Sequence, residues 1–344
     1  MIKVLLADDS PLVRGVLKDI FYATSDIEVA GEAANGKEAV DLTERLKPDL
    51  VVMDIMMPIM DGLAAIETIM AQFPTPILVL SATMDQREVD YAFTAIRKGA
   101  LDVMEKPRIQ GLEQGKEFAA RIVEKVRMLS RVKVIRRWPS NRVTVNVKPK
   151  VPAGYQIGER DILAIGASTG GPKAVMNIIK SLPENFGASV FIVQHIASGF
   201  ARGFAQWLDQ ESALKVRLAI PDQEFRAGEA LVAPNDCHMV IDQGRVRLVQ
   251  GDPVNCCRPS IDVFFSSLAE QLGARVVGVL LTGMGKDGAQ GLHRIKEQGG
   301  ITIVQDEKSC VVFGMPKAAI ALDAVDEVLP LPCIPEALSK IFAQ

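Results

Sequence analysis

The sequence lacks the features that would place it in a membrane or in a disulfide-stabilised fold. No apolar run reaches the roughly 18 residues that a membrane-spanning helix needs, and the short stretch Met1–Ala7 leads directly into Asp8 and Asp9 rather than into a signal-peptide core. Five cysteines are an odd number and include no Cys-x-x-Cys pair, so neither a disulfide framework nor a zinc site is indicated. We therefore expect a cytoplasmic protein with reduced thiols and no membrane insertion.

Histidine is also scarce, and there is no internal repeat or low-complexity tract. The three histidines are His195, His238 and His293, which leaves few candidates for a general base. What is present is ordinary globular composition, with 48% hydrophobic and 24% charged residues, which excludes disordered and fibrous classes. At about 150 residues per domain, a chain of 344 residues should form two domains.

The net charge of −3 conceals a strong partition along the chain. Residues 1–106 have net charge −8, residues 121–150 have +9 and residues 151–344 have −4. The basic stretch contains Pro139 and Pro149, and Pro152 follows it; these prolines interrupt any regular period. We therefore expect a first domain over residues 1–120, a basic linker over 121–157 and a second domain over 158–344.

The first domain alternates short β-branched runs with helical patterns, which is typical of a doubly wound parallel sheet. The expected strands are 3–7, 27–31, 50–53, 77–80 and 103–104. Ser10 is placed as an N-cap and Pro11 as the first residue of the helix that follows the first strand. The second domain shows the same alternation, with strands expected at 161–165, 189–193, 275–281 and 301–304. The fold class is therefore two doubly wound α/β domains.

Polar residues stand at the carboxyl ends of the first domain's strands. These are Asp8 and Asp9 after the first strand, Asp54 after the third, Ser81 after the fourth and Lys106 after the fifth. The carboxyl ends of parallel strands line one crevice, so these side chains should converge. Three neighbouring carboxylates repel one another unless a cation joins them, and an all-oxygen set suits Mg²⁺. The lysine and the serine hydroxyl could then contact a phosphoryl group.

This arrangement resembles a response-regulator receiver domain. The resemblance implies that Asp54 accepts a phosphoryl group from a histidine kinase, that Asp8 and Asp9 join it in holding Mg²⁺, and that Ser81 and Lys106 contact the phosphoryl group. One position departs from the pattern, because Val103 stands where such domains usually carry an aromatic switch residue. We therefore expect the signal to pass mainly through Ser81 and the loop after it.

In the second domain, Gly166-Ala167-Ser168-Thr169-Gly170-Gly171-Pro172 follows an expected strand and opens a helix. A dinucleotide-binding loop would have glycine at position 168 and an acidic residue about 20 positions later, and neither is found. The alternative is a nucleophile turn of the G-x-S-x-G type, which exposes a serine hydroxyl beside backbone N–H donors. The pattern favours the nucleophile turn.

A serine nucleophile needs a base and a group that orients it. His195 ends the next expected strand, whereas His238 and His293 read as structural. The strand 275–281 runs into a glycine-rich loop that brings Asp287 to the same edge of the sheet. The order Ser168, His195, Asp287 differs from that of α/β-hydrolases, but the roles of nucleophile, base and orienting carboxylate stay the same. The backbone N–H groups of Thr169 and Met284 are candidate oxyanion donors.

The segments around Ser168, His195 and Asp287, together with Arg258-Pro259-Ser260-Ile261-Asp262, resemble the chemotaxis protein-glutamate methylesterase family (CheB). The resemblance implies hydrolysis of glutamate methyl esters, and possible deamidation of glutamines, on chemoreceptor cytoplasmic helices, with no cofactor for hydrolysis. Two other functions are compatible with parts of this pattern. A receiver with a nucleic-acid-binding output should end in a compact helical domain, and a receiver-linked hydrolase of unrelated esters would share these motifs. We also expect the unphosphorylated receiver to restrain the esterase.

Overall fold

The computed structural model describes residues 1–81, 86–106, 112–134 and 160–343. The chain divides into two compact units, Met1–Thr144 and Val145–Gln344. Most of the expected basic linker, and the loop after Ser81, lie outside the described residues. Within the described ranges, no helix has both the length and the apolar character needed to cross a membrane.

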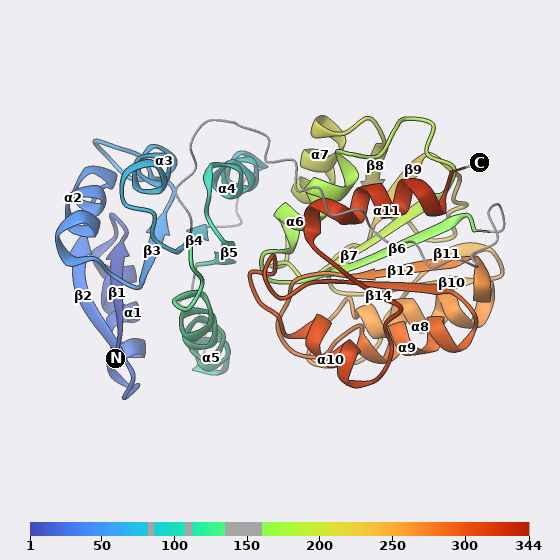
Figure 1. The fold of residues 1–344 in the computed structure, drawn as a ribbon. Coiled ribbons are helices and arrows are strands. Elements are labelled where there is room, and N and C mark those ends of the chain that lie inside the picture. Colours follow the sequence, from blue (N-terminus) through green and yellow to red (C-terminus); the bar gives the residue numbers. More distant parts are fainter. Residues whose placement is uncertain (82–85, 107–111, 135–159, 344) are drawn as a thin grey trace. The chain divides into compact units, whose positions relative to one another are not determined.

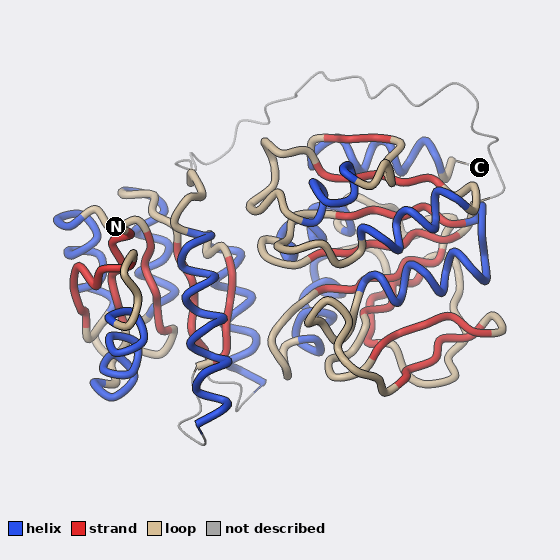
Figure 2. The backbone as a smooth tube through the Cα atoms, turned by 90° about the horizontal axis from the view of Figure 1, so that it is seen from below, coloured by secondary structure: helices blue, strands red, loops and turns tan. Residues whose placement is uncertain are grey.

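The first unit is a parallel five-stranded sheet in the order β2-β1-β3-β4-β5, between two layers of helices (Figure 1; Figure 2). Its strands are β1 (Ile2–Ala7), β2 (Ile27–Ala33), β3 (Leu50–Asp54), β4 (Ile77–Ser81) and β5 (Asp102–Glu105). Its helices are α1 (Pro11–Tyr22), α2 (Gly36–Leu46), α3 (Gly62–Gln72), α4 (Gln86–Lys98) and α5 (Leu112–Leu129). Helices α1 and α5 cover one face, and α2, α3 and α4 cover the other. All five expected strands of this sheet are present.

Side-chain caps define where the helices of this sheet begin. The Ser10 hydroxyl accepts a hydrogen bond from the Val13 N–H, and Pro11 opens α1, as predicted. Asn35 and Glu38 form a reciprocal cap at α2, in which the Asn35 side chain accepts from the Glu38 N–H at 3.0 Å. Helices α1 and α2 therefore begin at the carboxyl edge of the sheet, where the polar residues lie.

Helix α5 extends the first unit beyond its expected boundary. Ile122, Val126 and Leu129 are fully buried on this helix, and Arg127 forms an ion pair with Asp26 at 2.7 Å. The boundary expected at residue 120 therefore falls inside a helix of the receiver-like unit. The basic charge of residues 121–129 reflects the solvent-facing side of an amphipathic helix rather than the start of a linker.

The second unit is a seven-stranded sheet in the order β14-β13-β12-β6-β7-β9-β8, with every neighbouring pair parallel. Its strands are β6 (Ile162–Ala167), β7 (Ser189–Gln194), β8 (Lys215–Leu218), β9 (Glu229–Val232), β12 (Val276–Leu280), β13 (Ile301–Gln305) and β14 (Glu327–Leu329). An antiparallel hairpin of β10 (His238–Asp242) and β11 (Arg245–Val249) forms a separate two-stranded sheet. The four strands expected in this domain are β6, β7, β12 and β13, so the doubly wound prediction is confirmed.

Helices cover both faces of this sheet (Figure 1). The helices are α6 (Gly171–Ile179), α7 (Ala201–Glu211), α8 (Ile261–Leu272), α9 (Ala289–Glu297), α10 (Met315–Ala321) and α11 (Ile334–Ile341), with short 3-10 turns at Gly273–Arg275 and Leu331–Cys333. Helices α6, α7 and α11 lie on one side, and α8, α9 and α10 lie on the other. The strands β6, β7 and β12 are buried throughout, as expected for a parallel sheet covered on both faces.

Candidate active site

The candidate active site lies at the carboxyl ends of the three central strands of the second sheet. Strand β6 pairs with β7 on one side and with β12 on the other, so the order of the strands reverses direction at β6. Ser168 follows β6, His195 follows β7 and Asp287 lies in the loop after β12. The His195 N–H donates to the Ala167 carbonyl at 2.9 Å. The sheet therefore brings all three predicted residues to one edge.

Ser168 is held at a sharp corner by its backbone. Its N–H donates to the Thr282 carbonyl at 3.0 Å, and its carbonyl accepts from the Gly171 N–H at 2.8 Å. The corner needs glycine at Gly170, where φ is 75° and a Cβ would lie 2.5 Å from a methyl of Val311. The Ser168 hydroxyl forms no hydrogen bond within the described part of the chain, so in this structure it is not bonded to His195, whose ring nitrogens contact Asp287 and Cys257.

The loop after β12 passes unusually close to this serine. A Cβ on Gly283 would lie 2.7 Å from the Cβ of Ser168, so only glycine permits the approach. The next residue, Met284, is partly exposed, and among the described residues its backbone N–H donates no hydrogen bond. Thr169 is buried, and its carbonyl accepts from the Thr282 hydroxyl at 2.9 Å. Both residues predicted to donate to the oxyanion therefore lie near Ser168: Thr169 is the next residue in the chain, and Met284 belongs to the loop that approaches the serine.

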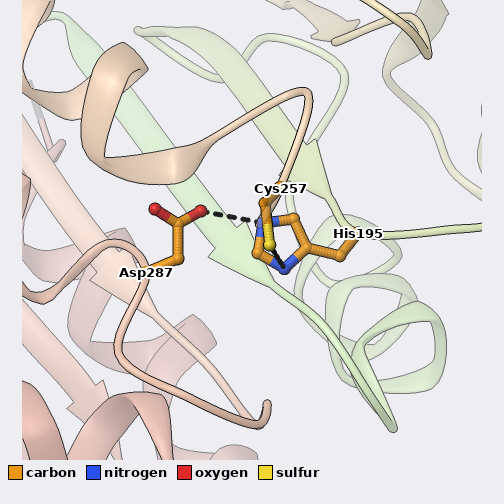
Figure 3. Close-up of side chains that lie close together, drawn as sticks. All are labelled: His195, Cys257 and Asp287. Atoms are coloured by element: carbon orange, nitrogen blue, oxygen red, sulfur yellow. Dashed lines mark hydrogen bonds and ion pairs between the residues drawn. The ribbon is translucent and has the colours of Figure 1, made fainter. Parts of the chain in front are cut away.

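His195 and Asp287 are directly bonded (Figure 3). The His195 Nε2 lies 2.9 Å from the Asp287 Oδ2. A carboxylate accepts hydrogen bonds, so this contact assigns the ring proton to Nε2 and leaves the lone pair on Nδ1. Nδ1 faces the Cys257 Sγ at 3.6 Å. The structure therefore joins two of the three predicted catalytic side chains, and it adds a thiol at the nitrogen that would act as the base.

Asp287 is buried and receives several other hydrogen bonds. The Ser260 hydroxyl donates to its Oδ1 at 2.7 Å, the Asn255 side-chain amide donates to Oδ1 at 3.0 Å, and the Ile261 N–H donates to Oδ2 at 2.7 Å. Burial raises the pKa of the Asp287 carboxyl, but its bonds and charge interaction with His195, together with Asn255 and Ser260, lower it below the ordinary value. The group therefore stays an anion that orients the imidazole.

Gln194 links the two catalytic loops from below. Its side-chain amide donates to the Ser168 carbonyl at 2.8 Å and to the His195 carbonyl at 2.9 Å. The side chain is buried, and its Oε1 accepts no hydrogen bond within the described residues. Gln194 thus ties the backbone of Ser168 to that of His195, a contact that sequence analysis did not predict.

Asn255 and Ser260 were also missed as parts of the site. Ser260 stood within the motif that carried the family resemblance, but its contact with Asp287 spans 27 positions and is not visible in a spacing pattern. His238 and His293 lie outside the site, as expected. The His238 ring is buried, with Nδ1 accepting from the Ser260 N–H and Nε2 bonded to the Asp252 carbonyl. It supports the loop that contacts Asp287.

The first unit has its own polar cluster at the carboxyl edge of its sheet. The Lys106 ammonium lies 2.9 Å from Asp8 Oδ2 and 2.8 Å from Asp54 Oδ2. Burial raises the pKa of the Asp54 carboxyl to about 6, against the opposing effect of Lys106. For Lys106, burial lowers the pKa, but the pairs with Asp54 and Asp8 raise it above its ordinary value. The lysine is therefore a fixed positive charge beside Asp54.

The acidic residues of this cluster fit a hard divalent cation. One carboxylate oxygen from each of Asp8, Asp9 and Asp54 lies within 4.8 Å of the others. The Asp8 Oδ2 is buried and accepts no hydrogen bond from the described residues, although Lys106 lies beside it as an ion-pair partner. An oxygen-only set of three neighbouring carboxylates suits Mg²⁺. The predicted ligand set is therefore brought together.

Ser81 and Val103 complete the edge of this sheet. Ser81 ends β4, one position beyond the pair Asp54–Leu80, and its carbonyl accepts from the Lys106 N–H at 2.9 Å. Val103 is buried within β5 and is 6% exposed. An aromatic switch residue can turn between a buried and an exposed rotamer. The small side chain of Val103 has no comparable exposed rotamer.

Comparison with known proteins gives matches over both units. Residues 163–338 match a family model described as CheB methylesterase, and residues 4–114 match the response regulator receiver domain. The chain is similar to a protein-glutamate methylesterase/protein-glutamine glutaminase of Anaeromyxobacter dehalogenans, with 45% identity over 340 residues that cover 99% of this chain and 97% of the relative. A relative of the same description from Pyrococcus horikoshii is 41% identical over 349 residues, covering 98% and 93%.

Among solved structures, the crystal structure of the Thermotoga maritima CheB methylesterase catalytic domain aligns with a TM-score of 0.51 and 40% identity. The alignment covers 53% of this chain and 98% of that chain. The second unit therefore has the fold of a hydrolase domain, and the alternative of a helical nucleic-acid-binding output is not supported.

Proposed function

The chain belongs to the CheB methylesterase family, with a receiver domain ahead of its hydrolase domain, and from this we propose that Ser168 is the nucleophile with which it acts. Members of this family are protein-glutamate methylesterases and protein-glutamine glutaminases, and this chain is one of them. The observation that carries the assignment of residues is the bonded pair of His195 and Asp287 at the strand edge beside Ser168.

The proposed reaction proceeds by acyl transfer. Nδ1 of His195 accepts the proton of the Ser168 hydroxyl as the oxygen attacks the γ-carbonyl carbon of a methylated glutamate. The backbone N–H groups of Thr169 and Met284 bind the oxyanion, and each such donor contributes about 3 kcal/mol in other hydrolases. As the bond to the leaving group breaks, His195 gives its proton to the methoxide oxygen, which departs as methanol, or to the amide nitrogen of glutamine, which departs as ammonia, and an acyl ester on Ser168 remains. Water, activated by the same imidazole, releases the glutamate.

Asp287 acts through His195 in this scheme. It holds the proton on Nε2, so that Nδ1 is the basic nitrogen, and its negative charge stabilises the imidazolium that forms during attack. No cofactor takes part in these steps.

We assign phosphorylation to Asp54 in the receiver. Mg²⁺, held by Asp8, Asp9 and Asp54, would neutralise the negative charge that gathers as a phosphoryl group approaches. Lys106 and Ser81 would contact the bound phosphoryl group, which a histidine kinase supplies. The substrate is a methylated glutamate on a chemoreceptor cytoplasmic helix, which places the reaction in the cytoplasm.

Methanol release from methylated receptor membranes tests the catalytic assignment. The variants Ser168→Ala, His195→Ala and Asp287→Ala should each keep the circular dichroism of the wild type and lose activity by factors on the order of 10⁴ or more, because the three groups act as a unit. A folded Ser168→Ala protein with near-normal methanol release would disprove the serine mechanism.

Phosphate incorporation tests the receiver assignment. A small phosphodonor should label the wild type in Mg²⁺ but not in EDTA, and it should leave Asp54→Asn unlabelled. Asp41→Asn is the matched control, because Asp41 is exposed on α2 and is not one of the three clustered carboxylates. Equal labelling of Asp54→Asn and Asp41→Asn would show that Asp54 is not the acceptor.

A further inference from the structure

A cysteine lies against the His195 ring and contacts the ring nitrogen that Asp287 does not bond (Figure 3). The Cys257 Sγ is 3.6 Å from the His195 Nδ1, and the His195 Nε2 is 2.9 Å from Asp287. The three side chains therefore stand in the order thiol, imidazole, carboxylate. This is the order of nucleophile, base and orienting group in cysteine-dependent acyl transfer.

The position of the thiol is built into the loop that carries it. The Val254 and Cys257 backbones pair with each other through two hydrogen bonds of 3.1 and 2.9 Å. Asn255 donates from its side-chain amide to Asp287 at 3.0 Å and to Asp262 at 2.7 Å. His238 holds the end of the same loop through the Ser260 N–H. The loop is thus fixed to the same carboxylate that orients the base.

The neighbouring thiol provides an internal comparison. Cys256 is exposed, whereas Cys257 is half-buried. Access alone therefore favours reaction at Cys256. Only Cys257 contacts an imidazole whose other nitrogen is held by a buried carboxylate, and an adjacent base is what converts a thiol into the nucleophilic thiolate.

We propose that Cys257, His195 and Asp287 form a second nucleophilic site, at which Cys257 is covalently modified by small uncharged electrophiles. With iodoacetamide, the Cys257 proton passes to the His195 Nδ1 as the sulfur forms a bond to the methylene carbon. The carbon–iodine bond breaks, and iodide leaves with its electron pair. The product is a carbamidomethyl thioether, and the imidazolium releases its proton to water.

An adduct on Cys257 would also stop the hydrolase. A group attached to Sγ occupies the space beside Nδ1, which is the nitrogen that takes the proton of Ser168. This second consequence rests on the proposed function, whereas the reactivity of the thiol does not. The two are measured separately, so that failure of one is distinguishable from failure of the other.

The experiment treats the full-length chain with iodoacetamide at neutral pH and follows each cysteine by peptide mass spectrometry, with methanol release measured on the same samples. Cys257 should be labelled at least ten times faster than Cys256. His195→Ala should slow labelling of Cys257 about tenfold and leave the rate at Cys256 unchanged, and His195→Gln serves the same purpose if the alanine variant is unfolded. In the wild type, hydrolysis should fall in step with labelling of Cys257.

Two variants separate the thiols. Cys256→Ser should remain sensitive to iodoacetamide, and methanol release by Cys257→Ser, compared with its own untreated sample, should be resistant. Equal labelling of the two cysteines, or a Cys257 rate that does not depend on His195, would overturn the proposal. Rapid labelling of Cys257 with undiminished methanol release would keep the reactive site but contradict Nδ1 as the base for Ser168, and so contradict the proposed mechanism.

Discussion

Asp287 connects three parts of the catalytic domain through one buried carboxylate. Replacing it with asparagine would turn an N–H group toward donors such as the Ser260 hydroxyl and the Ile261 N–H. Because breaking a buried charge pair leaves unsatisfied partners, we expect Asp287→Asn to lower the free energy of unfolding of this domain by about 3 kcal/mol. Urea denaturation measures this change in the free energy of unfolding. Asp242→Asn, at an exposed position, is the control and should change stability by less than about 0.5 kcal/mol.

This stabilisation should depend on pH with a definite sign. The pKa of the Asp287 carboxyl is lowered in the folded protein, so its contribution is complete above the unfolded value of about 4 and is lost as pH falls through the folded value. The difference in unfolding free energy between wild type and Asp287→Asn should therefore narrow as pH falls below about 4. A difference that stays constant from pH 7 to pH 3 would contradict the assigned ionisation.

Gln194 bonds the backbone carbonyls of the proposed nucleophile and the proposed base. Gln194→Met keeps the length of the side chain but removes the amide that bonds the Ser168 and His195 carbonyls. We expect kcat to fall about tenfold with little change in KM, because small displacements of a reacting pair are costly. Steady-state methanol release measures both constants. Gln298→Met, at an exposed position, is the control, and an equal effect there would remove the special role of Gln194.

At the level of elements, α5 decides where the receiver domain ends. Burial of an aliphatic side chain contributes about 1.5–3 kcal/mol, and Ile122, Val126 and Leu129 are all buried on α5. A fragment of residues 1–120 should therefore unfold at a much lower urea concentration than a fragment of residues 1–134. Equal urea midpoints for the two fragments would show that α5 beyond residue 120 does not stabilise the receiver.

The sequence predicts the central strands better than the edges of the sheets. β6, β7, β12 and β13 are long buried runs, and such runs are recognisable without knowledge of their neighbours. β8 (Lys215–Leu218) and β14 (Glu327–Leu329) are short, partly exposed edge strands that depend on pairing with a neighbour, so no local pattern marks them. The sequence analysis did not predict the hairpin of β10 and β11, because this hairpin forms a separate two-stranded sheet and is not part of the alternating α/β pattern.

The same distinction applies to the candidate sites. Ser168, His195 and Asp287 follow predictable strands, so topology alone places them at one edge. Asn255 and Cys257 lie in an irregular loop between β11 and α8, and their approach to Asp287 and His195 depends on the path of that loop. Hydrogen-bond partners of that kind are determined by tertiary structure, which spacing in the sequence does not report.

For the whole molecule, the charge partition bears on regulation. The receiver carries −8 over residues 1–106, and the segment 121–150 carries +9. Phosphorylation at the proposed site Asp54 would add about one to two negative charges, and we expect it to draw Lys106 from its present pairs with Asp8 and Asp54. We expect the unphosphorylated receiver to restrain the esterase and phosphorylation to shift the population toward an active form.

A fragment that begins at Val151 tests this restraint. It should release methanol faster than the unphosphorylated full-length chain, and a phosphodonor should leave its rate unchanged. A fragment slower than the full-length chain would instead make the receiver an activator or a targeting module. The corresponding single substitution is Asp54→Asn. With a phosphodonor present, this variant should release methanol at the rate of the unphosphorylated full-length chain.

The most direct test of the whole account is the release of methanol from methylated receptor membranes by the full-length chain, in Mg²⁺, with and without a small phosphodonor. Wild type should release methanol in both conditions and faster with the phosphodonor, whereas Ser168→Ala should release none in either. Methanol release by a folded Ser168→Ala protein, or a wild-type rate that the phosphodonor does not raise, would contradict a serine hydrolase controlled by its receiver.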